Sequence, residues 1–131
     1  MGFYIKKPSV FVRKEEKDHG TKKRVEGGNV KGKRVLLLED LVTTGSSSLS
    51  GVRALRNEGA IVKDCLVIVN YGFPEAAQAF KKAKVRLHAL TPFSLILREA
   101  VSSKKCTPEE AKIVREWYRD PWAWTRSRGS R

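Results

Sequence analysis

Long hydrophobic runs are missing from this sequence. Its longest uninterrupted apolar stretches cover only a few residues, at 35–38 and 66–69. A membrane-spanning helix needs about 20 consecutive apolar residues, so no segment of this chain is expected to cross a bilayer. The first residues also lack the basic-then-apolar layout of a secretion signal.

Cysteine is scarce as well. The chain of 131 residues has two cysteines, Cys65 within an apolar stretch and Cys106 ahead of a predicted helix. Two cysteines so placed form neither a disulfide framework nor a pattern of metal ligands. We therefore expect a cytoplasmic protein whose thiols stay reduced.

Acidic residues are few compared with basic ones. The chain has 27 Lys and Arg against 14 Asp and Glu, which gives a formal net charge of +13. Such an excess favours a polyanionic partner: nucleic acid, a phosphorylated metabolite or an anionic membrane surface. The hydrophobic share of 40% in a mixed pattern excludes a disordered chain, a collagen and a coiled coil. The length predicts a single domain over residues 1–131.

Apolar stretches alternate with helical patterns along most of the chain. Strands are predicted at residues 35–38, at 61–62 with 65–69, and at 85–90. The predicted helices cover about 46–58, 74–83, 93–100 and 107–118, the last opening with a Thr107–Glu110 capping box. Because strands alternate with helices, we expect an α/β fold with a parallel sheet flanked by helices.

The first strand pattern raises the question of what covers the sheet. The run at 35–38 is continuous rather than alternating, which indicates a strand buried on both faces. Residues 1–7 are too short to supply a helix layer in front of it. Either the sheet is small, or a partner covers it, or the chain lacks an N-terminal portion.

Two segments lack apolar periodicity. Residues 14–32 are almost all charged, Gly or Asn, which indicates either a mobile functional loop or a disordered linker. A basic, Trp-containing tail at about 120–131 fits either packing on the domain or across a dimer, or stacking with single-stranded nucleic acid. His88 stands in a strand pattern without polar neighbours, which indicates a structural or surface residue.

The segment after the first predicted strand carries the clearest chemistry. Glu39 and Asp40 stand at the strand's C-terminal end, where open α/β sheets bind ligands. Residues 43–48 then offer hydroxyl and backbone N–H groups at a helix N-terminus, which suits a phosphate dianion. The acids would repel that phosphate, so they suit another part of one ligand: sugar hydroxyls, directly or through Mg²⁺. Together these residues predict a site for a phosphorylated ribose, and ordinary helix capping beside a solvated strand end is the alternative.

This segment closely resembles the phosphoribosyl pyrophosphate (PRPP) motif of type I phosphoribosyltransferases. Residues 13–20, Arg-Lys-Glu-Glu-Lys-Asp-His-Gly, resemble the mobile catalytic loop of the orotate phosphoribosyltransferases within that family. Residues 70–76 and 117–121 also look like segments of some bacterial and archaeal members. The resemblance implies a Rossmann-like type I core, truncated at its N-terminus. It also implies an enzyme of pyrimidine (UMP) biosynthesis that converts orotate and PRPP to orotidine 5′-monophosphate and pyrophosphate.

The resemblance also implies a role for each matching residue. Glu39 and Asp40 would hold the ribose hydroxyls, and Thr43 would contact orotate as well as phosphate. The residues implied to cradle the 5′-phosphate are Thr43, Thr44, Gly45, Ser46 and Ser47. Those implied to grip the pyrophosphate are Arg13, Lys14, Lys17 and His19, and those implied in catalysis are Lys17, His19 and Asp40. Mg²⁺ would be held mainly through PRPP with no direct protein ligand, in a homodimer that shares the loop between subunits and has no membrane partner.

Several residues depart from the family's pattern and keep further interpretations open. Glu39 stands where many members carry aspartate, the cations at 22–24 replace a more glycine-rich loop, and Asn70 and Tyr71 stand where many place an orotate-binding Arg. One such interpretation is a non-catalytic regulator on the same fold that binds PRPP or RNA. An inactive fragment of the enzyme and a phosphoribosyltransferase for another base are two more.

Overall fold

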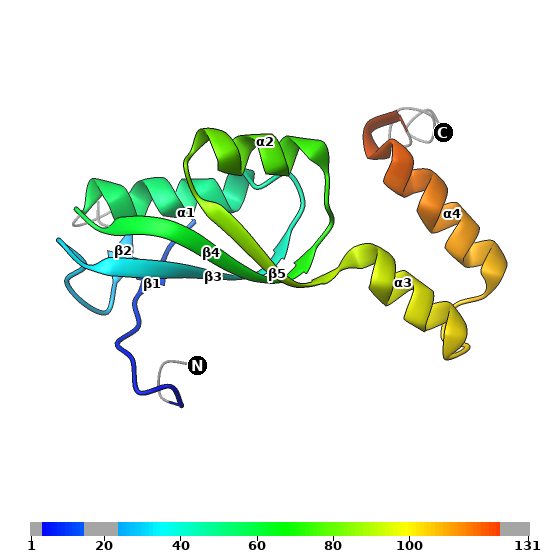
Figure 1. Ribbon diagram of the computed structural model, residues 1–131, viewed down its shortest axis with the longest axis horizontal. Helices are drawn as coiled ribbons and strands as arrows, with labels where there is room; N and C mark the ends of the chain where they lie inside the picture. Colours follow the sequence, from blue (N-terminus) through cyan, green and yellow to red (C-terminus); the bar gives the residue numbers. More distant parts are fainter. Residues whose placement is uncertain (1–3, 15–23, 124–131) are drawn as a thin grey trace. The chain divides into compact units, whose positions relative to one another are not determined.

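The computed structural model of this protein describes residues 4–14 and 24–123, and its chain divides into two compact units, Met1–Pro92 and Phe93–Arg131 (Figure 1). The first unit contains the elements β1 (Phe11–Val12), β2 (Val25–Glu26), β3 (Arg34–Val42), α1 (Ser46–Asn57), β4 (Ile61–Asn70), α2 (Pro74–Lys82) and β5 (Arg86–Pro92). The second unit contains α3 (Phe93–Ser102) and α4 (Pro108–Arg119).

A three-stranded sheet in the order β3-β4-β5 forms the centre of the first unit, and all its strands run parallel. Leu38 pairs with Leu66, and Leu66 pairs with His88, across the three strands. Helices α1 and α2 lie on the same side of this sheet (Figure 1). The predicted alternation of strands and helices and the α/β fold class are therefore confirmed.

The hydrophobic core lies between the sheet and these two helices. Val52 and Leu55 of α1 and Phe80 of α2 are almost completely buried against Cys65 and Val67 of β4. These residues follow the helical and strand periodicities that predicted the elements. The side chains on this face therefore hold α1 at a fixed position relative to the carboxyl end of β3.

The short β1–β2 ribbon is also part of the folded body. β1 and β2 pair antiparallel, and Val25 and Val30 belong to the hydrophobic core. The second half of the segment in which we predicted a loop, 14–32, is thus packed against the sheet unit. Residues 15–23 of that segment lie outside the described residues.

The opposite face of the sheet differs from expectation. Leu37 is buried, but its neighbours Leu36 and Leu38 are exposed, so the prediction that residues 35–38 are buried on both faces is wrong. The physical reason is that α1 and α2 both pack on one face of the sheet. The continuous apolar run therefore marks a surface that the first unit does not cover itself.

In the second unit, the predicted capping box at the start of α4 is confirmed. The backbone N–H of Glu110 donates to Thr107 Oγ1 at 3.2 Å, and the Glu110 carboxylate accepts from the Thr107 N–H at 2.8 Å. The rings of Phe93 and Tyr118 stack with centroids 5.9 Å apart. None of the described helices combines the length and the apolar character that crossing a membrane requires. The end of the tail, residues 124–131, lies outside the described residues.

Candidate functional site

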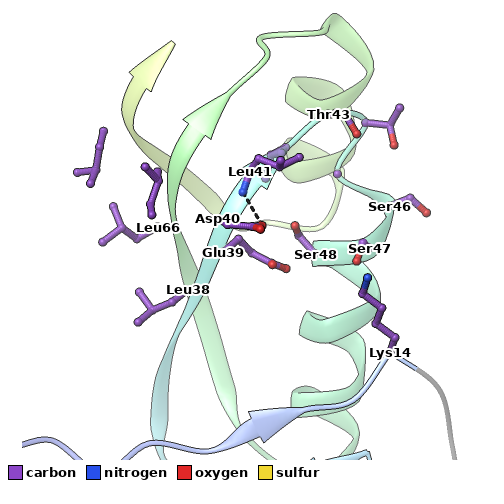
Figure 2. A pocket seen from close by; sticks show the side chains of 15 residues that line it. Lys14, Leu38, Glu39, Asp40, Leu41, Thr43, Ser46, Ser47, Ser48 and Leu66 are labelled. Carbon is purple, nitrogen blue, oxygen red and sulfur yellow. Dashed lines mark hydrogen bonds between the residues drawn. The ribbon is translucent and has the colours of Figure 1, made fainter. Parts of the chain in front are cut away.

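A cavity of about 1120 Å³ lies at the carboxyl end of β3, between that strand and the N-terminus of α1 (Figure 2). Its polar lining is Lys14, Glu39, Asp40, Thr43, Thr44, Gly45, Ser46, Ser47 and Ser48. Almost all residues that the sequence predicted for a phosphorylated ribose are thus brought together. The carboxyl end of a parallel strand is also where open α/β sheets place their ligands.

The turn from β3 into α1 depends on Gly45. Its φ of 80° lies in the left-handed region, and a Cβ there would sit 2.8 Å from Phe80 Cε2. Both the backbone conformation and the close approach of Phe80 therefore require glycine at this position. The Gly45 carbonyl accepts the Leu49 N–H at 2.9 Å, which begins α1 directly after the turn.

The first turn of α1 is electrostatically suited to an anion. It contains no acidic residue, and Gly45 has no side chain with which to cap it. The leading N–H groups and the positive end of the helix dipole therefore face the cavity without a protein acceptor from the cap. Lys14 extends its amine toward this turn, in the direction of Ser47 (Figure 2). The loop and helix start thus form a cradle with partial positive charge.

The two carboxylates differ in their surroundings. Asp40 is exposed, and its Oδ1 accepts the Leu41 N–H at 2.7 Å, which leaves its other oxygen open to a ligand. Glu39 is partly buried, and its charge contributes to the environment of Cys65. Burial first, and the Glu39 carboxylate second, raise the pKa of the Cys65 thiol to about 11. Carboxylate oxygens at this end of the strand can accept hydrogen bonds from sugar hydroxyls or bind a hard cation.

Some predicted site residues are not placed in the cavity. Arg13 pairs instead with Glu26 through two hydrogen bonds of 2.8 and 3.0 Å, which together with the Glu26 charge raise the pKa of Arg13. Arg24 donates to the Arg13 carbonyl and to Ser50 Oγ, linking this ribbon to α1. Lys17 and His19 lie outside the described residues, so their implied roles stay predictions.

Sequence reasoning missed the apolar part of the cavity. Leu38, Leu66, Ile68 and Leu90 line it from three neighbouring strands. Their positions, from the middle of successive parallel strands onward, were a usable signal, because the carboxyl ends of such strands meet at one edge. Ser48, the third serine of the motif, is buried and lines the cavity too.

His88 is an exposed surface residue of β5, as predicted, but the expectation that it has no polar neighbours is wrong. His88 Nε2 lies 2.8 Å from Asp64 Oδ1, and Arg86 donates to both oxygens of the same carboxylate at 2.7 and 2.9 Å. The pairing follows from strand register, which places β5 beside β4. These residues are outside the cavity, and they stabilise the pairing of the two strands.

Comparison with known proteins gives the family. Residues 3–90, which contain the cavity and nearly all of the sheet unit, match the phosphoribosyl transferase domain family. The chain belongs to this family. Its type I core was the fold that the motif at residues 39–47 implied.

Members named orotate phosphoribosyltransferase are among the similar proteins. That of Porphyromonas gingivalis is 38% identical over 117 residues, which is 89% of this chain and 56% of that protein. The crystal structure of the Aeropyrum pernix orotate phosphoribosyltransferase superposes with a TM-score of 0.67 at 35% identity, covering 75% of this chain and 54% of that one. The Mycobacterium tuberculosis orotate phosphoribosyltransferase in complex with PRPP gives 0.54 at 31% identity, covering 65% and 47%. The chain thus spans about half the length of the relatives that it matches.

Proposed function

We propose that this chain provides the PRPP-binding part of an orotate phosphoribosyltransferase, which joins orotate to PRPP and releases pyrophosphate and orotidine 5′-monophosphate. The observation that carries the proposal is the cavity at the end of β3, which combines the uncapped start of α1 with two adjacent carboxylates. The names of the relatives support the orotate enzyme and do not favour a non-catalytic regulator.

In this proposal two sides of the cavity bind two parts of PRPP, its 5′-phosphate and its ribose. The turn at 43–45 and the first turn of α1, with Ser46 and Ser47, hold the 5′-phosphate through backbone N–H and hydroxyl groups. Glu39 and Asp40 accept hydrogen bonds from the ribose hydroxyls. In this proposal Thr43, which lines the cavity at the start of the turn, contacts the nucleobase as well.

Departure of pyrophosphate leaves positive charge on the ribose and negative charge on the leaving group. Cations near the leaving group lower the barrier because they stabilise charge that develops in the transition state. We assign this role to Lys14 at the cavity and to Lys17 and His19 of the adjoining segment, with Arg13 joining if its pair with Glu26 opens. A lysine and a histidine beside the leaving group also supply protons or hydrogen bonds to its oxygens.

Mg²⁺ suits this chemistry because, when bound, it neutralises the negative charge of the PRPP phosphates. Among the described residues no three acidic, His or Cys side chains gather into a metal cage. The available donors, Glu39 and Asp40, fit a hydrated cation that is held mainly by the phosphates of PRPP. We further assign the protein to a homodimer that shares the predicted loop at 14–32, with Lys17 and His19, between subunits. We assign it to the cytoplasm, where its two free cysteines stay reduced.

The test is PRPP binding and product formation by matched variants. We expect Asp40→Asn to weaken Mg²⁺-dependent PRPP binding, measured by calorimetry, by roughly 10- to 100-fold, because it removes a charged acceptor of a sugar hydroxyl. Asp64→Asn is the matched control, since Asp64 is a carboxylate of the same sheet outside the cavity. We expect its affinity for PRPP to match that of the unchanged protein.

Turnover is measured separately, as formation of orotidine 5′-monophosphate from orotate, PRPP and Mg²⁺. Loss of turnover in Lys17→Ala with PRPP affinity largely kept would support the role assigned to the leaving-group cations. An unchanged protein that binds no PRPP, or equal affinities for the Asp40 and Asp64 variants, would overturn the proposed function.

A further inference from the structure

Arg24 links the end of strand β1 to helix α1. It stands directly before β2 and is partly buried. Its Nε donates to the Arg13 carbonyl at 2.9 Å, and its Nη1 donates to Ser50 Oγ at 3.0 Å and to the Ser50 carbonyl at 3.4 Å. The Arg13 N–H in turn donates to the Arg24 carbonyl at 2.8 Å. The main chain and the side chain of Arg24 thus hold both polar backbone groups of Arg13.

The hydrogen bond on the Arg13 carbonyl bears on the direction of the next side chain, that of Lys14. The carbonyl oxygen belongs to the peptide unit that joins Arg13 to Lys14, and the atoms of a peptide unit, including the following Cα, lie close to one plane. Holding the oxygen therefore orients this plane and with it the Cα of Lys14. From that Cα the Lys14 side chain extends to the cavity that it lines.

Helix α1 is the reference against which both groups are placed. Ser50 accepts from Arg24, and Ser47, toward which the Lys14 amine extends, lies three residues earlier in α1 (Figure 2). Residues three apart are neighbours on one face of a helix, with about 5–6 Å between their Cβ atoms. Arg24 therefore ties Lys14 to the helix whose first turn is part of the phosphate cradle.

The bridge requires an arginine. The Nε and Nη1 donors lie in one rigid plane and reach acceptors on two elements at once, whereas a lysine ammonium is a point charge on a flexible stem. The acceptors of Arg24, the Arg13 carbonyl and two Ser50 oxygens, are neutral. The contribution of Arg24 is therefore geometric, and a lysine at this position would keep the charge but lose the bridge.

We propose that Arg24 is a positioning residue for PRPP binding, which holds the Lys14 ammonium at the phosphate cradle by fixing the Arg13 peptide to Ser50 of α1. The inference rests on the proposed function, because it concerns how the same cavity holds PRPP. Arg24 itself lies outside the lining of the cavity. Its effect on affinity therefore exists only while Lys14 is present.

Calorimetry of PRPP binding in the presence of Mg²⁺ tests the bridge. We expect Arg24→Lys to weaken binding by about tenfold although it retains the positive charge, because Lys14 then spends less time at the cradle. Ser50→Ala should weaken binding by about threefold, since the Ser50 carbonyl still accepts from Arg24. Alanine is the better helix former, so the loss in Ser50→Ala should come without a loss of stability.

Arg56→Lys is the matched control. Arg56 donates to the Ala83 and Val62 carbonyls at 2.9 and 2.6 Å, so it also bridges elements through neutral oxygens, but from the last turn of α1. Its affinity for PRPP should equal that of the unchanged protein. Denaturant unfolding of each variant measures stability separately, and the ribbon should stay in place because Val12 and Val25 pack in the core.

A double-mutant cycle tests whether Arg24 acts through Lys14. In a chain that already carries Lys14→Ala, the further change Arg24→Lys should cause no additional loss of affinity, because the group that it positions is absent. A general effect of Arg24 on the fold would instead add its full loss to that of Lys14→Ala.

Three results would overturn the positioning role and leave the proposed function standing. These are full affinity of Arg24→Lys for PRPP, an equal loss from Arg24→Lys with and without Lys14, or an equal loss from Arg56→Lys. If the unchanged protein binds no PRPP, the proposed function falls and this inference falls with it. The two failures are therefore distinguished by the unchanged protein.

Discussion

Gly45 combines two constraints at one position of the phosphate cradle. Its left-handed φ of 80° disfavours any other residue, and an added Cβ would lie 2.8 Å from the Phe80 ring. We expect Gly45→Ala to lower the free energy of unfolding by about 1–3 kcal/mol, from backbone strain and displacement of Phe80. We also expect it to reduce PRPP affinity at least tenfold, because the loop no longer presents its N–H groups in register. Denaturant unfolding and calorimetry measure the two effects.

Gly32→Ala is the control that separates strain from the clash. Gly32 has a comparable φ of 72°, but a Cβ added there would meet no atom within 4 Å. In this variant the free energy of unfolding should fall by only the cost of the left-handed backbone, about 1 kcal/mol, and the affinity for PRPP should be unchanged. Equal effects of the two substitutions on PRPP affinity would contradict a specific role for the close approach of Phe80 to the turn.

The two cysteines should differ strongly in reactivity. Cys65 is fully buried, and burial together with the Glu39 charge raises the pKa of its thiol to about 11. Since the thiolate is the nucleophile, the raised pKa keeps Cys65 protonated and unreactive at about pH 8. Cys106 is only partly buried. Under native conditions iodoacetamide should label Cys106 first, as read by peptide mass spectrometry, and both should react in denaturant. Labelling of Cys65 at the rate of Cys106 would contradict the buried environment.

At the scale of elements, local pattern was sufficient to predict the type and order of the elements from β3 to α4. The strand at 85–90 and the helix at 74–83 fall within two residues of the observed β5 and α2, and the Thr107–Glu110 capping box is present. The pattern also indicated that residues 35–38 are covered on both faces of the sheet. The first unit covers only one of these faces. The periodicity of apolar residues indicates which side chains are to be buried. Which surface buries them depends on the assembled fold.

The candidate site likewise has one part that local sequence predicted and another that depends on the assembled fold. Residues 39–47 were predictable because their chemistry is local: adjacent carboxylates, hydroxyls and a glycine at a helix start. The leucines of the cavity and the Asp64–His88 pair depend on which strands become neighbours. The pair of Arg13 with Glu26 depends on the β1–β2 ribbon, whose two-residue strands leave almost no pattern in the sequence.

The pairing of β4 with β5 should depend on pH through Asp64. Hydrogen bonds from Arg86, then from His88, lower the pKa of Asp64 to about 2. Because the folded-state pKa is below the ordinary value of 3.8, its stabilising contribution is complete above about pH 4 and is lost as the pH falls toward 2. Asp64→Asn should therefore lower Tm at about pH 6, and its difference from the unchanged protein should vanish between about pH 4 and 2. Thermal melts followed by circular dichroism test this. A difference in Tm that is constant across this range would exclude Asp64 as its source.

At the scale of the whole molecule, the two units differ in how much core they have. The first unit buries a continuous cluster between its sheet and two helices, whereas Ala111 is the one fully buried residue of the second unit within the described residues. Stability should therefore be unevenly distributed, since regions with few buried apolar contacts open locally at lower free energy.

Native-state hydrogen exchange should reveal two cooperative units. Amides of β4 should exchange slowest and those of α3 and α4 faster, because the latter are protected by little buried surface. Leu55→Ala removes a side chain that is 1% exposed in the core of the first unit, and we expect it to lower the protection of β3, β4 and β5 by about 2–5 kcal/mol. The protection of α4 should stay unchanged.

Ala111→Glu makes the reciprocal change, since it places a charge at a fully buried position of α4. It should accelerate exchange in α3 and α4 only. Loss of protection in both units from either substitution would show that the chain unfolds as one cooperative body, and the division into two units would then have no energetic counterpart.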